Sequence, residues 1–403
     1  MALGEDFRRL WTAYGISELG TGVGFGAIPL VAVLVLEVGE FQVSLLAALA
    51  GVAAAALALP AGPWIEFRRK RPVMIAADLA RFGALITVPL AMAAGVLTYV
   101  QLCAVAVVQS AAAIAFASAS GSHLKALVGP ADRVTATSRF EATFWTAYSA
   151  GPALGGALTS WFGAAVTIAV DAVSFLLSAL GVRALRSPEP DPPQRIKPTG
   201  KWSEIADGWR YLIAHRGLRA VFLNQQIFAG AMMAASPLLA VLMLRELAFP
   251  PWQYGLAWGA SCLGGILGAL AMRPLTDRFG AHRVLLGSGV FRALWLAPLA
   301  FLPAGVPGLV LMIALEVLAL FGSGVSNPSV ATYRMTETDD RHLSRVIACW
   351  QITSRTAQPV CIALGGALAA VTSVRTALLV CGLGVLASSV LLPWREPVSA
   401  API

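Results

Sequence analysis

Long apolar runs follow one another along almost the whole chain, with short polar stretches between them. A helix needs roughly 20 mostly apolar residues to cross the hydrocarbon core of a bilayer. Twelve runs reach about that length, at 10–36, 42–62, 73–96, 99–122, 138–160, 164–184, 219–243, 253–273, 284–303, 307–330, 346–369 and 374–393. The pattern predicts an all-α membrane protein with twelve transmembrane helices.

The polar stretches after the second and eighth runs resemble each other. Pro63 in the first corresponds to Pro274 in the second, an offset of 211 residues, and the same offset carries Arg81 onto Arg292. A repeat of about half the chain is common among secondary transporters. We therefore expect two six-helix bundles related by an internal repeat.

A polar, proline-rich stretch separates the two halves. Residues 187–200 have the composition of an extended linker. After them Trp202, Trp209 and their apolar neighbours recur at helical spacing, which predicts an interfacial helix on the membrane surface. The alternative is a simple continuation of the linker. The expected domains are an N-terminal bundle (1–186), a cytoplasmic linker with this helix (187–216) and a C-terminal bundle (217–403).

Composition supports the membrane assignment. The 403 residues are 58% hydrophobic and 12% charged, with a mean hydropathy of +0.74, whereas a soluble domain carries about 25% charged residues. The net charge of +8 is explained by basic loops, so we expect no nucleic-acid partner. The five cysteines lie in apolar runs without a CxxC pair or a histidine cluster, so neither disulfides, a metal site nor a cofactor is predicted.

The basic residues indicate the orientation of the chain. Cytoplasmic loops of membrane proteins are enriched in Lys and Arg. With both termini in the cytoplasm, the outer loops hold only Arg245 and Arg375, and the other loop bases lie inside. The first apolar run contains Glu18 and lacks a small-residue cleavage site, so we expect a retained first helix rather than a signal peptide. The expected location is the cytoplasmic (inner) membrane of a bacterium.

The loop after the second run resembles a signature of the major facilitator superfamily, in its drug:proton antiporter branch that includes macrolide-efflux and enterobactin-export proteins. That signature reads approximately Gly-x-x-x-Asp-Arg-x-x-Arg-Arg. Its matches here are Gly62, Glu66, Lys70 and Arg71, with Glu in place of Asp and Phe67 in place of the usual Arg; the second half keeps Asp277 and Arg278. Further resemblances are Asp78-Leu-Ala-Arg81 and Asp171-Ala-Val-Ser-Phe175.

The fifth run contains Gly151-Pro152-Ala-Leu-Gly155-Gly156, which resembles the motif associated with antiporters of this superfamily. The upstream glycines of the full motif are absent, with Ser138 and Ala147 in the places where they would stand. The resemblance favours export as the direction of transport.

The loop motif is physically suited to a conformational latch. An acid at the end of the second helix can accept hydrogen bonds from loop bases and from a nearby helix N-terminus. Such contacts would hold the cytoplasmic side closed and break when the cavity opens inward. The residues assigned to this latch are Gly62, Glu66, Arg69, Lys70, Arg71, Asp277, Arg278, Asp78 and Arg81. The alternative is that the bases only fix the topology. We expect Asp78 and Arg81, one turn apart, to form a local ion pair.

By the family resemblance, helices 1, 4, 7 and 10 line a central cavity, and each carries a polar group. Glu18 lies eight residues, or about 12 Å, from the start of helix 1, and Glu316 lies at a similar depth on helix 10. An ionised carboxylate at that depth is costly, so each could carry a proton or bind a cationic substrate. Either could instead be a protonated structural acid.

Other intramembrane polar groups have two interpretations each. Gln109 on helix 4 and the amides of Asn224, Gln225 and Gln226 on helix 7 could contact substrate or join helices. A cavity-facing Arg355 would favour an anionic substrate or pair with Glu316 or Glu18. Asp171 on helix 6 is a further candidate for proton coupling.

These features predict a secondary active transporter that works by alternating access. We expect proton-coupled export of a lipophilic or amphipathic small molecule, such as a drug, a siderophore or another natural product. No Walker motif and no nucleophile–base arrangement occurs, so neither ATP hydrolysis nor another enzymatic activity is predicted. The expected partners are the substrate, protons and the bilayer, and a monomer suffices. The alternatives are an importer, a lipid translocator or a receptor without turnover.

Overall fold

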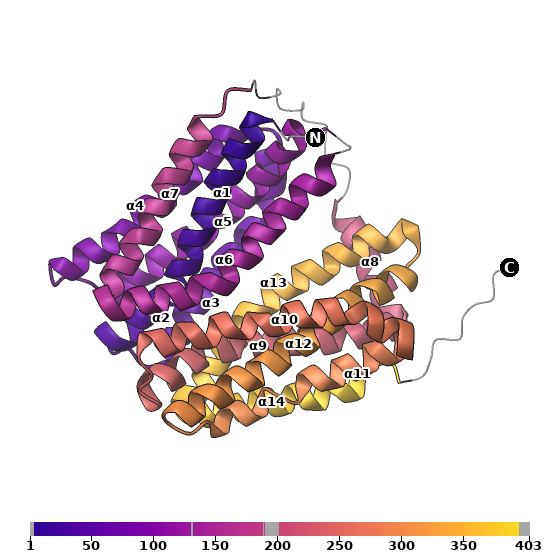
Figure 1. Ribbon diagram of the computed structural model, residues 1–403. Coiled ribbons are helices and arrows are strands. Elements are labelled where there is room, and N and C mark those ends of the chain that lie inside the picture. The colour runs from indigo at the N-terminus through magenta and orange to yellow at the C-terminus, as the bar shows by residue number, and fades with distance from the viewer. Residues whose placement is uncertain (1–3, 130–131, 188, 190–200, 395–403) are drawn as a thin grey trace. The chain divides into compact units, whose positions relative to one another are not determined.

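The computed structural model describes residues 4–129, 132–187, 189 and 201–394, and leaves out the side chains of 58–66, 133–134, 201–205, 340 and 344. Every regular element in this part of the chain is a helix (Figure 1). The first half contains α1 (Glu5–Gly24), α2 (Ala27–Leu30), α3 (Glu40–Glu66), α4 (Lys70–Ala93), α5 (Tyr99–Leu127), α6 (Arg133–Phe162) and α7 (Ala164–Arg183). The second half contains α8 (Lys201–Ala214), α9 (Arg216–Val241), α10 (Pro251–Phe279), α11 (Ala281–Ala293), α12 (Val306–Thr336), α13 (Asp340–Val371) and α14 (Val374–Ser388).

Helix boundaries repeat at the offset found in the sequence. A shift of 211 residues carries the start of α1 onto that of α9, and the start of α4 onto that of α11. It also carries the π-helical turn at Val31–Val35 onto the π-helical turn at Leu242–Glu246. Each turn is followed by a non-glycine residue with positive φ, Glu37 at 51° and Ala248 at 52°. The two halves therefore share even their irregular backbone geometry.

Ten helical stretches in the described residues are long and apolar enough to cross a membrane. α6 and α13 are 30 and 32 residues long but are not among the ten. Both carry several polar groups: α6 has Arg139 and Glu141, and α13 has Arg355 and Gln358. The predicted all-α membrane architecture is confirmed, whereas the count of twelve spans is not.

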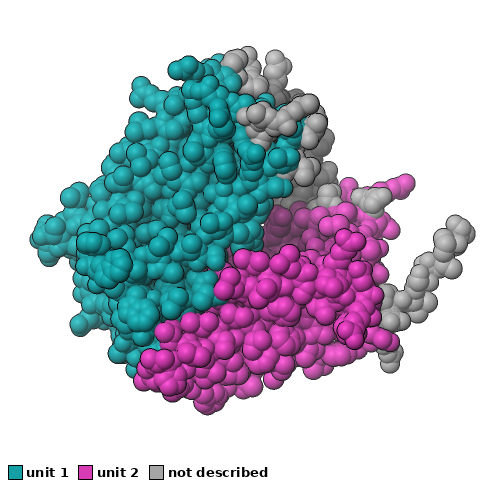
Figure 2. Space-filling view, in the orientation of Figure 1, with its two compact units in different colours: residues 1–196, 240–260 teal, residues 197–239, 261–403 magenta. Residues whose placement is uncertain are grey.

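The helices group into two compact units (Figure 2). Unit 1 contains residues 1–196 and 240–260, and unit 2 contains 197–239 and 261–403. Unit 1 thus holds α1–α7 together with the end of α9 and the start of α10. Most of the C-terminal half forms unit 2.

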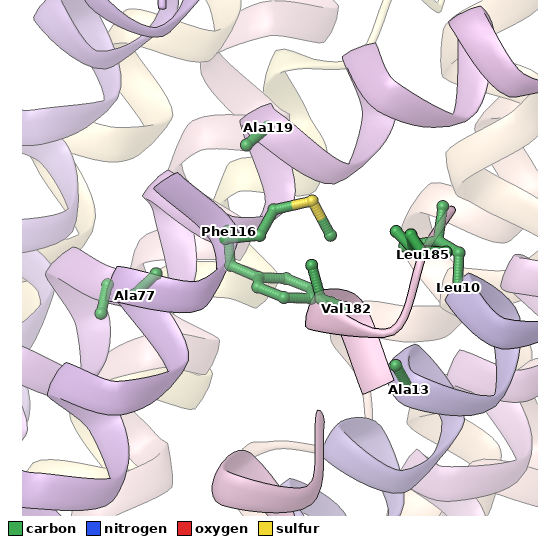
Figure 3. Close-up of a cluster of buried hydrophobic side chains, with 9 residues drawn as sticks. Leu10, Ala13, Ala77, Phe116, Ala119, Val182 and Leu185 are labelled. Atoms are coloured by element: carbon green, nitrogen blue, oxygen red, sulfur yellow. The ribbon is translucent and has the colours of Figure 1, made fainter. Parts of the chain in front are cut away.

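The core of unit 1 is a set of small and large apolar side chains from four helices. Leu10 and Ala13 of α1 meet Met74 of α4, Phe116 of α5 and Val182 at the end of α7 (Figure 3). Such interlocking supplies the van der Waals packing that holds helices together in a lipid environment. It also brings the polar residues of α1, α4, α5 and α7 to one region.

The core of unit 2 includes the helix predicted after the linker. α8 packs against α13, and its Leu212 is fully buried beside Phe222 of α9 and Trp350 of α13. The predicted helix is confirmed for Lys201–Ala214, while its location at the membrane surface stays a prediction. The proline-rich residues 190–200 lie outside the described part of the chain.

Candidate functional site

Arg81 is the centre of a buried polar cluster in unit 1. Its Nε donates to Gln109 Oε1 of α5 at 3.1 Å, and its Nη2 donates to Thr21 Oγ1 of α1 at 3.2 Å. Gln109 Nε2 donates back to the Arg81 carbonyl at 2.8 Å. The guanidinium carbon lies 3.7 Å from the ring centre of Phe175 on α7, a cation–π contact. One arginine therefore joins α1, α4, α5 and α7.

Three carboxyl groups lie close enough to Arg81 to interact with its charge. They belong to Asp171 of α7, Asp78 of α4 and Glu18 of α1. Asp78 is fully buried and Asp171 is 9% exposed. Within the described residues both oxygens of Asp78, and Oδ1 of Asp171, have no hydrogen-bond partner. The cluster holds more acid than base in an apolar interior.

The expected ion pair between Asp78 and Arg81 is not formed. Among the described atoms neither Asp78 oxygen accepts a hydrogen bond from Arg81, and its neighbouring hydroxyl is that of Ser178 on α7. One helical turn of separation permits a pair, but the guanidinium turns instead toward Gln109, Thr21 and Phe175. Asp78 thus belongs to a shared cluster rather than to a local pair.

Glycines on α1 make room for the acid on α7. A Cβ at Gly24 would lie 2.2 Å from Asp171 Oδ2, and one at Gly20 would lie 1.9 Å from Ser174 Oγ. Contacts under 3 Å cannot be accommodated without movement of a neighbour. The two glycines therefore set the position of the Asp171 carboxyl group.

Unit 2 contains a second buried arginine with a different set of partners. Arg292, the repeat mate of Arg81, donates to Gln225 Oε1 at 2.8 Å and to Asn224 Oδ1 at 2.9 Å. It also lies 4.0 Å from the ring centre of Phe228. Asn224 Nδ2 donates to the carbonyl of Ser388 at 3.0 Å. These partners are neutral, so this arginine lacks the excess of acid found around Arg81.

The amides of helix 7 bind neighbouring helices. Asn224 connects α9 to α11 and α14, and Gln225 connects α9 to α11 and reaches Asn327 of α12 at 3.4 Å. Gln226 accepts from Ser354 Oγ of α13 at 3.0 Å. All three amides join helices, which is one of the two interpretations that the sequence leaves open.

Glu316 and Arg355 do not form the pair considered from the sequence. Glu316 on α12 is 1% exposed, and within the described residues neither of its carboxyl oxygens has a hydrogen-bond partner. Arg355 on α13 is exposed. Glu316 is therefore a buried acid that accepts no hydrogen bond from the described residues of unit 2.

The N-terminal latch residues end α3 and begin α4. The side chain of Glu66 and the surroundings of Gly62 lie outside the described part of the structure. The backbone N–H groups of Lys70 and Arg71 donate to the carboxylate of Glu189, which therefore interacts with the N-terminus of α4. Arg71 also donates to the carbonyl groups of Leu185, at 3.1 Å, and Ser187. Glu189 thus provides at α4 the kind of contact predicted for Glu66.

The corresponding residues of the second half are exposed. Asp277 approaches Arg273 at 3.9 Å, with both side chains largely in contact with solvent or lipid. The Arg278 guanidinium lies 5.3 Å from the ring centre of Phe279. Neither contact joins different helices, so a latch that involves Arg69, Asp277 and Arg278 stays a prediction.

The glycine motif on α6 permits close helix packing. A Cβ at Gly151 would lie 2.4 Å from the backbone of Gly22 on α1, and one at Gly155 would lie 1.9 Å from the carbonyl oxygen of Val23. On another face of α6, Gly156 lies against the first turns of α10, where a Cβ at Gly156 would lie 2.5 Å from the carbonyl oxygen of Pro251. Each motif glycine therefore marks a helix crossing.

Several residues of the Arg81 cluster were not identified as functional from the sequence. Thr21, Gly20 and Gly24 lie in a small-residue stretch of the first helix that carried no chemical signal. Phe175 was noted only as part of the Asp171–Phe175 resemblance. The sequence signal for this cluster is the spacing of Asp78 and Arg81 on α4, which by itself predicts only a local pair.

Comparison with known proteins places the chain in a family. It matches the family described as transmembrane secretion effector over residues 4–399. It is 27% identical over 372 residues to the multidrug efflux pump Tap of Mycobacterium tuberculosis, covering 88% of this chain and 84% of that protein. Tap of Mycolicibacterium fortuitum is 27% identical over 238 residues, covering 58% and 56%.

Solved structures share the fold at low sequence identity. A bacterial homologue of the iron transporter ferroportin in an inward-facing state superimposes with a TM-score of 0.77 at 16% identity, covering 97% of this chain and 98% of that one. The nucleoside transporter NupG gives 0.75 at 15% identity, covering 97% and 100%. The chain belongs to the transmembrane secretion effector family of the major facilitator superfamily, whose members are multi-pass membrane transporters and not enzymes.

Proposed function

We propose that this transporter exports a lipophilic or amphipathic small molecule in exchange for protons, by alternating access between two six-helix bundles. The substrate class would be a drug, a siderophore or another natural product. The proposed cavity groups are those named from the sequence: Glu18, Gln109, Asp171, Asn224, Gln225, Gln226, Glu316 and Arg355.

The cluster around Arg81 carries the proposal. With every group ionised, its three carboxylates and one guanidinium would leave two uncompensated negative charges inside the membrane-spanning part of unit 1. Buried uncompensated charge is strongly unfavourable. Binding of protons or of a cationic substrate relieves it, and the two compete for the same carboxylates. Such competition is what proton-coupled antiport requires.

Export and a lipophilic substrate are supported by the relatives and by α6. The similarity to Tap extends over most of both chains, and Tap is a multidrug efflux pump. The motif from Gly151 to Gly156 resembles that of antiporters, and its glycines lie at helix crossings. Other members of the fold include a nucleoside transporter and a ferroportin homologue, so fold alone does not assign direction.

We further infer twelve spans, with α6 and α13 crossing the membrane despite their polarity. At 30 and 32 residues both exceed the roughly 20 needed. An even number of spans places both termini on the same side of the membrane, and the basic loops indicate that this side is the cytoplasm.

An impermeant maleimide applied to intact cells should label a Val96→Cys variant but not an Asp207→Cys variant, each in a background lacking native cysteines. The reverse pattern would invert the proposed orientation.

Proton release from everted membrane vesicles tests the activity. Vesicles energised to be acid inside would receive lipophilic cations, macrolides and siderophores in turn, and an internal pH dye would report proton movement. We expect one compound class to release protons from the lumen. Substrate-dependent movement of protons into the lumen would identify an importer. A compound that binds the purified protein but moves no protons would favour a receptor without turnover.

A further inference from the structure

An apolar crevice of about 370 Å³ opens on unit 2 between α10, α11 and α12. Its walls include Leu275 and Phe279 of α10, Gly287 and Phe291 of α11, and Phe321 of α12. Ser288 also faces it, but the Ser288 hydroxyl bonds to the Leu285 carbonyl of its own helix at 3.4 Å. The crevice therefore offers a hydrocarbon surface and no unsatisfied polar group from that serine.

The positive charge of Arg283 lies at one end of the crevice, next to a basic stretch of the sequence. Arg283, on the first turn of α11, is one of the lining residues. Residues 273–283 contain three arginines and one aspartate, a net formal charge of +2 with histidine neutral. α11 begins after Gly280, which has no side chain to cap the helix, and a helix N-terminus favours an anion. This end attracts negative charge.

The length of the crevice matches a lipid chain within one leaflet. Arg283 and Phe291 are eight residues apart on α11, or about 12 Å at 1.5 Å per residue. Half of a bilayer hydrocarbon core is about 15 Å. A headgroup at Arg283 would therefore place its acyl chain beside Phe291 and Phe321.

The repeat does not require this crevice. At the offset of 211, Arg283 corresponds to Pro72, Phe291 to Ala80 and Phe321 to Ser110. The corresponding stretch 62–72 is also basic, but the arginine that lines the crevice and both aromatic walls belong to the second half alone. Their combination has no role in the shared architecture of the two halves.

We infer that this crevice binds an anionic phospholipid, with the phosphate at Arg283 and an acyl chain along Phe291 and Phe321. Basic pockets between transmembrane helices on the cytoplasmic side are suited to anionic lipid headgroups. Assignment to the inner leaflet rests on the orientation proposed above, whereas the site itself does not depend on transport activity. Because Gly322 in the crevice packs against Arg292, the lipid would also support the contact of α11 with α12.

Thermal unfolding of the delipidated, detergent-solubilised full chain tests the site. A ligand that binds the folded state raises the melting temperature with its concentration. We expect phosphatidylglycerol to raise it more than phosphatidylcholine. In Arg283→Gln the two lipids should act equally. Equal shifts in the wild type, or a preference that survives Arg283→Gln, would overturn the assignment of the headgroup site.

A second variant separates loss of the site from loss of the fold. A Cβ at Gly287 would meet no atom within 4 Å, so Gly287→Leu fills the crevice without a clash at that atom. Its melting temperature without lipid should equal or exceed that of the wild type, and its phosphatidylglycerol shift should be lost. The matched control is Gly83→Leu, also with open space around its Cβ, which should keep the shift. A full shift in a stable Gly287→Leu would overturn the proposal.

Discussion

The position of the Asp171 carboxyl group depends on the absence of a side chain at Gly24 on α1. Gly24 leaves space for Asp171, and a methyl group there would lie 2.2 Å from Oδ2. Gly24→Ala must therefore displace the Asp171 side chain or separate α1 from α7. Misplacement by about 1 Å at a reacting group can cost roughly 100-fold in rate, so we predict a loss of transport of roughly 10- to 100-fold.

Substrate uptake into everted vesicles checks this prediction at equal protein levels. Gly121→Ala is the control, because a Cβ there meets no atom within 4 Å. It should transport like the wild type. Normal transport by Gly24→Ala would mean that the observed position of Asp171 is not required for function.

Asn224 contributes to stability through its contacts with neighbouring helices. Its amide accepts from Arg292 and donates to Ser388, so Asn224→Ala leaves a buried guanidinium nitrogen and a carbonyl without these partners. Such losses cost about 1–3 kcal/mol. We predict a lower melting temperature for the purified protein. Gln226→Ala, which removes contacts to neutral groups only, should lower it less.

At the scale of elements, the two π-helical turns carry equivalent strain. Ala248 follows the second turn with φ of 52°, a region that costs an L-residue roughly 1–2 kcal/mol. Glycine avoids that cost. We predict that Ala248→Gly raises the stability of the detergent-solubilised protein by about 1 kcal/mol. Ala260→Gly, within α10, should lower it by about 1 kcal/mol. A loss of stability in both variants would show that the backbone there is not strained.

The elements were more predictable from the sequence than their contacts. Apolar run length and the offset of 211 residues indicated every long helix and the correspondence of α4 with α11, because both depend on local pattern. Nothing in the sequence indicated the π-helical turns, whose geometry depends on tertiary packing. The prediction that Asp78 pairs with Arg81 was wrong. Helical spacing allows that contact, but Gln109 and Phe175, which are distant in sequence, bind the guanidinium instead.

At the scale of the whole molecule, the two halves keep one backbone plan and differ in charge. Arg81 is surrounded by three acids, whereas its mate Arg292 is held by two amides and a phenylalanine ring. A symmetric scaffold with an asymmetric charge distribution suits a transporter in which one half binds the proton and the other is structural. We therefore propose that proton coupling resides in unit 1, and we expect Glu316→Gln to reduce coupling less than changes around Arg81.

Substrate-induced proton release from everted vesicles of the Asp171→Asn variant is the most direct test of this account. The compound would be one that releases protons with the wild type, and Asp207→Asn, altered at the partly exposed surface of α8, would be the control. We predict that Asp171→Asn still binds the compound but releases no protons, while Asp207→Asn releases them normally. Wild-type proton release by Asp171→Asn, and equally by Asp78→Asn and Glu18→Gln, would contradict the proposal that the acids around Arg81 couple transport to protons.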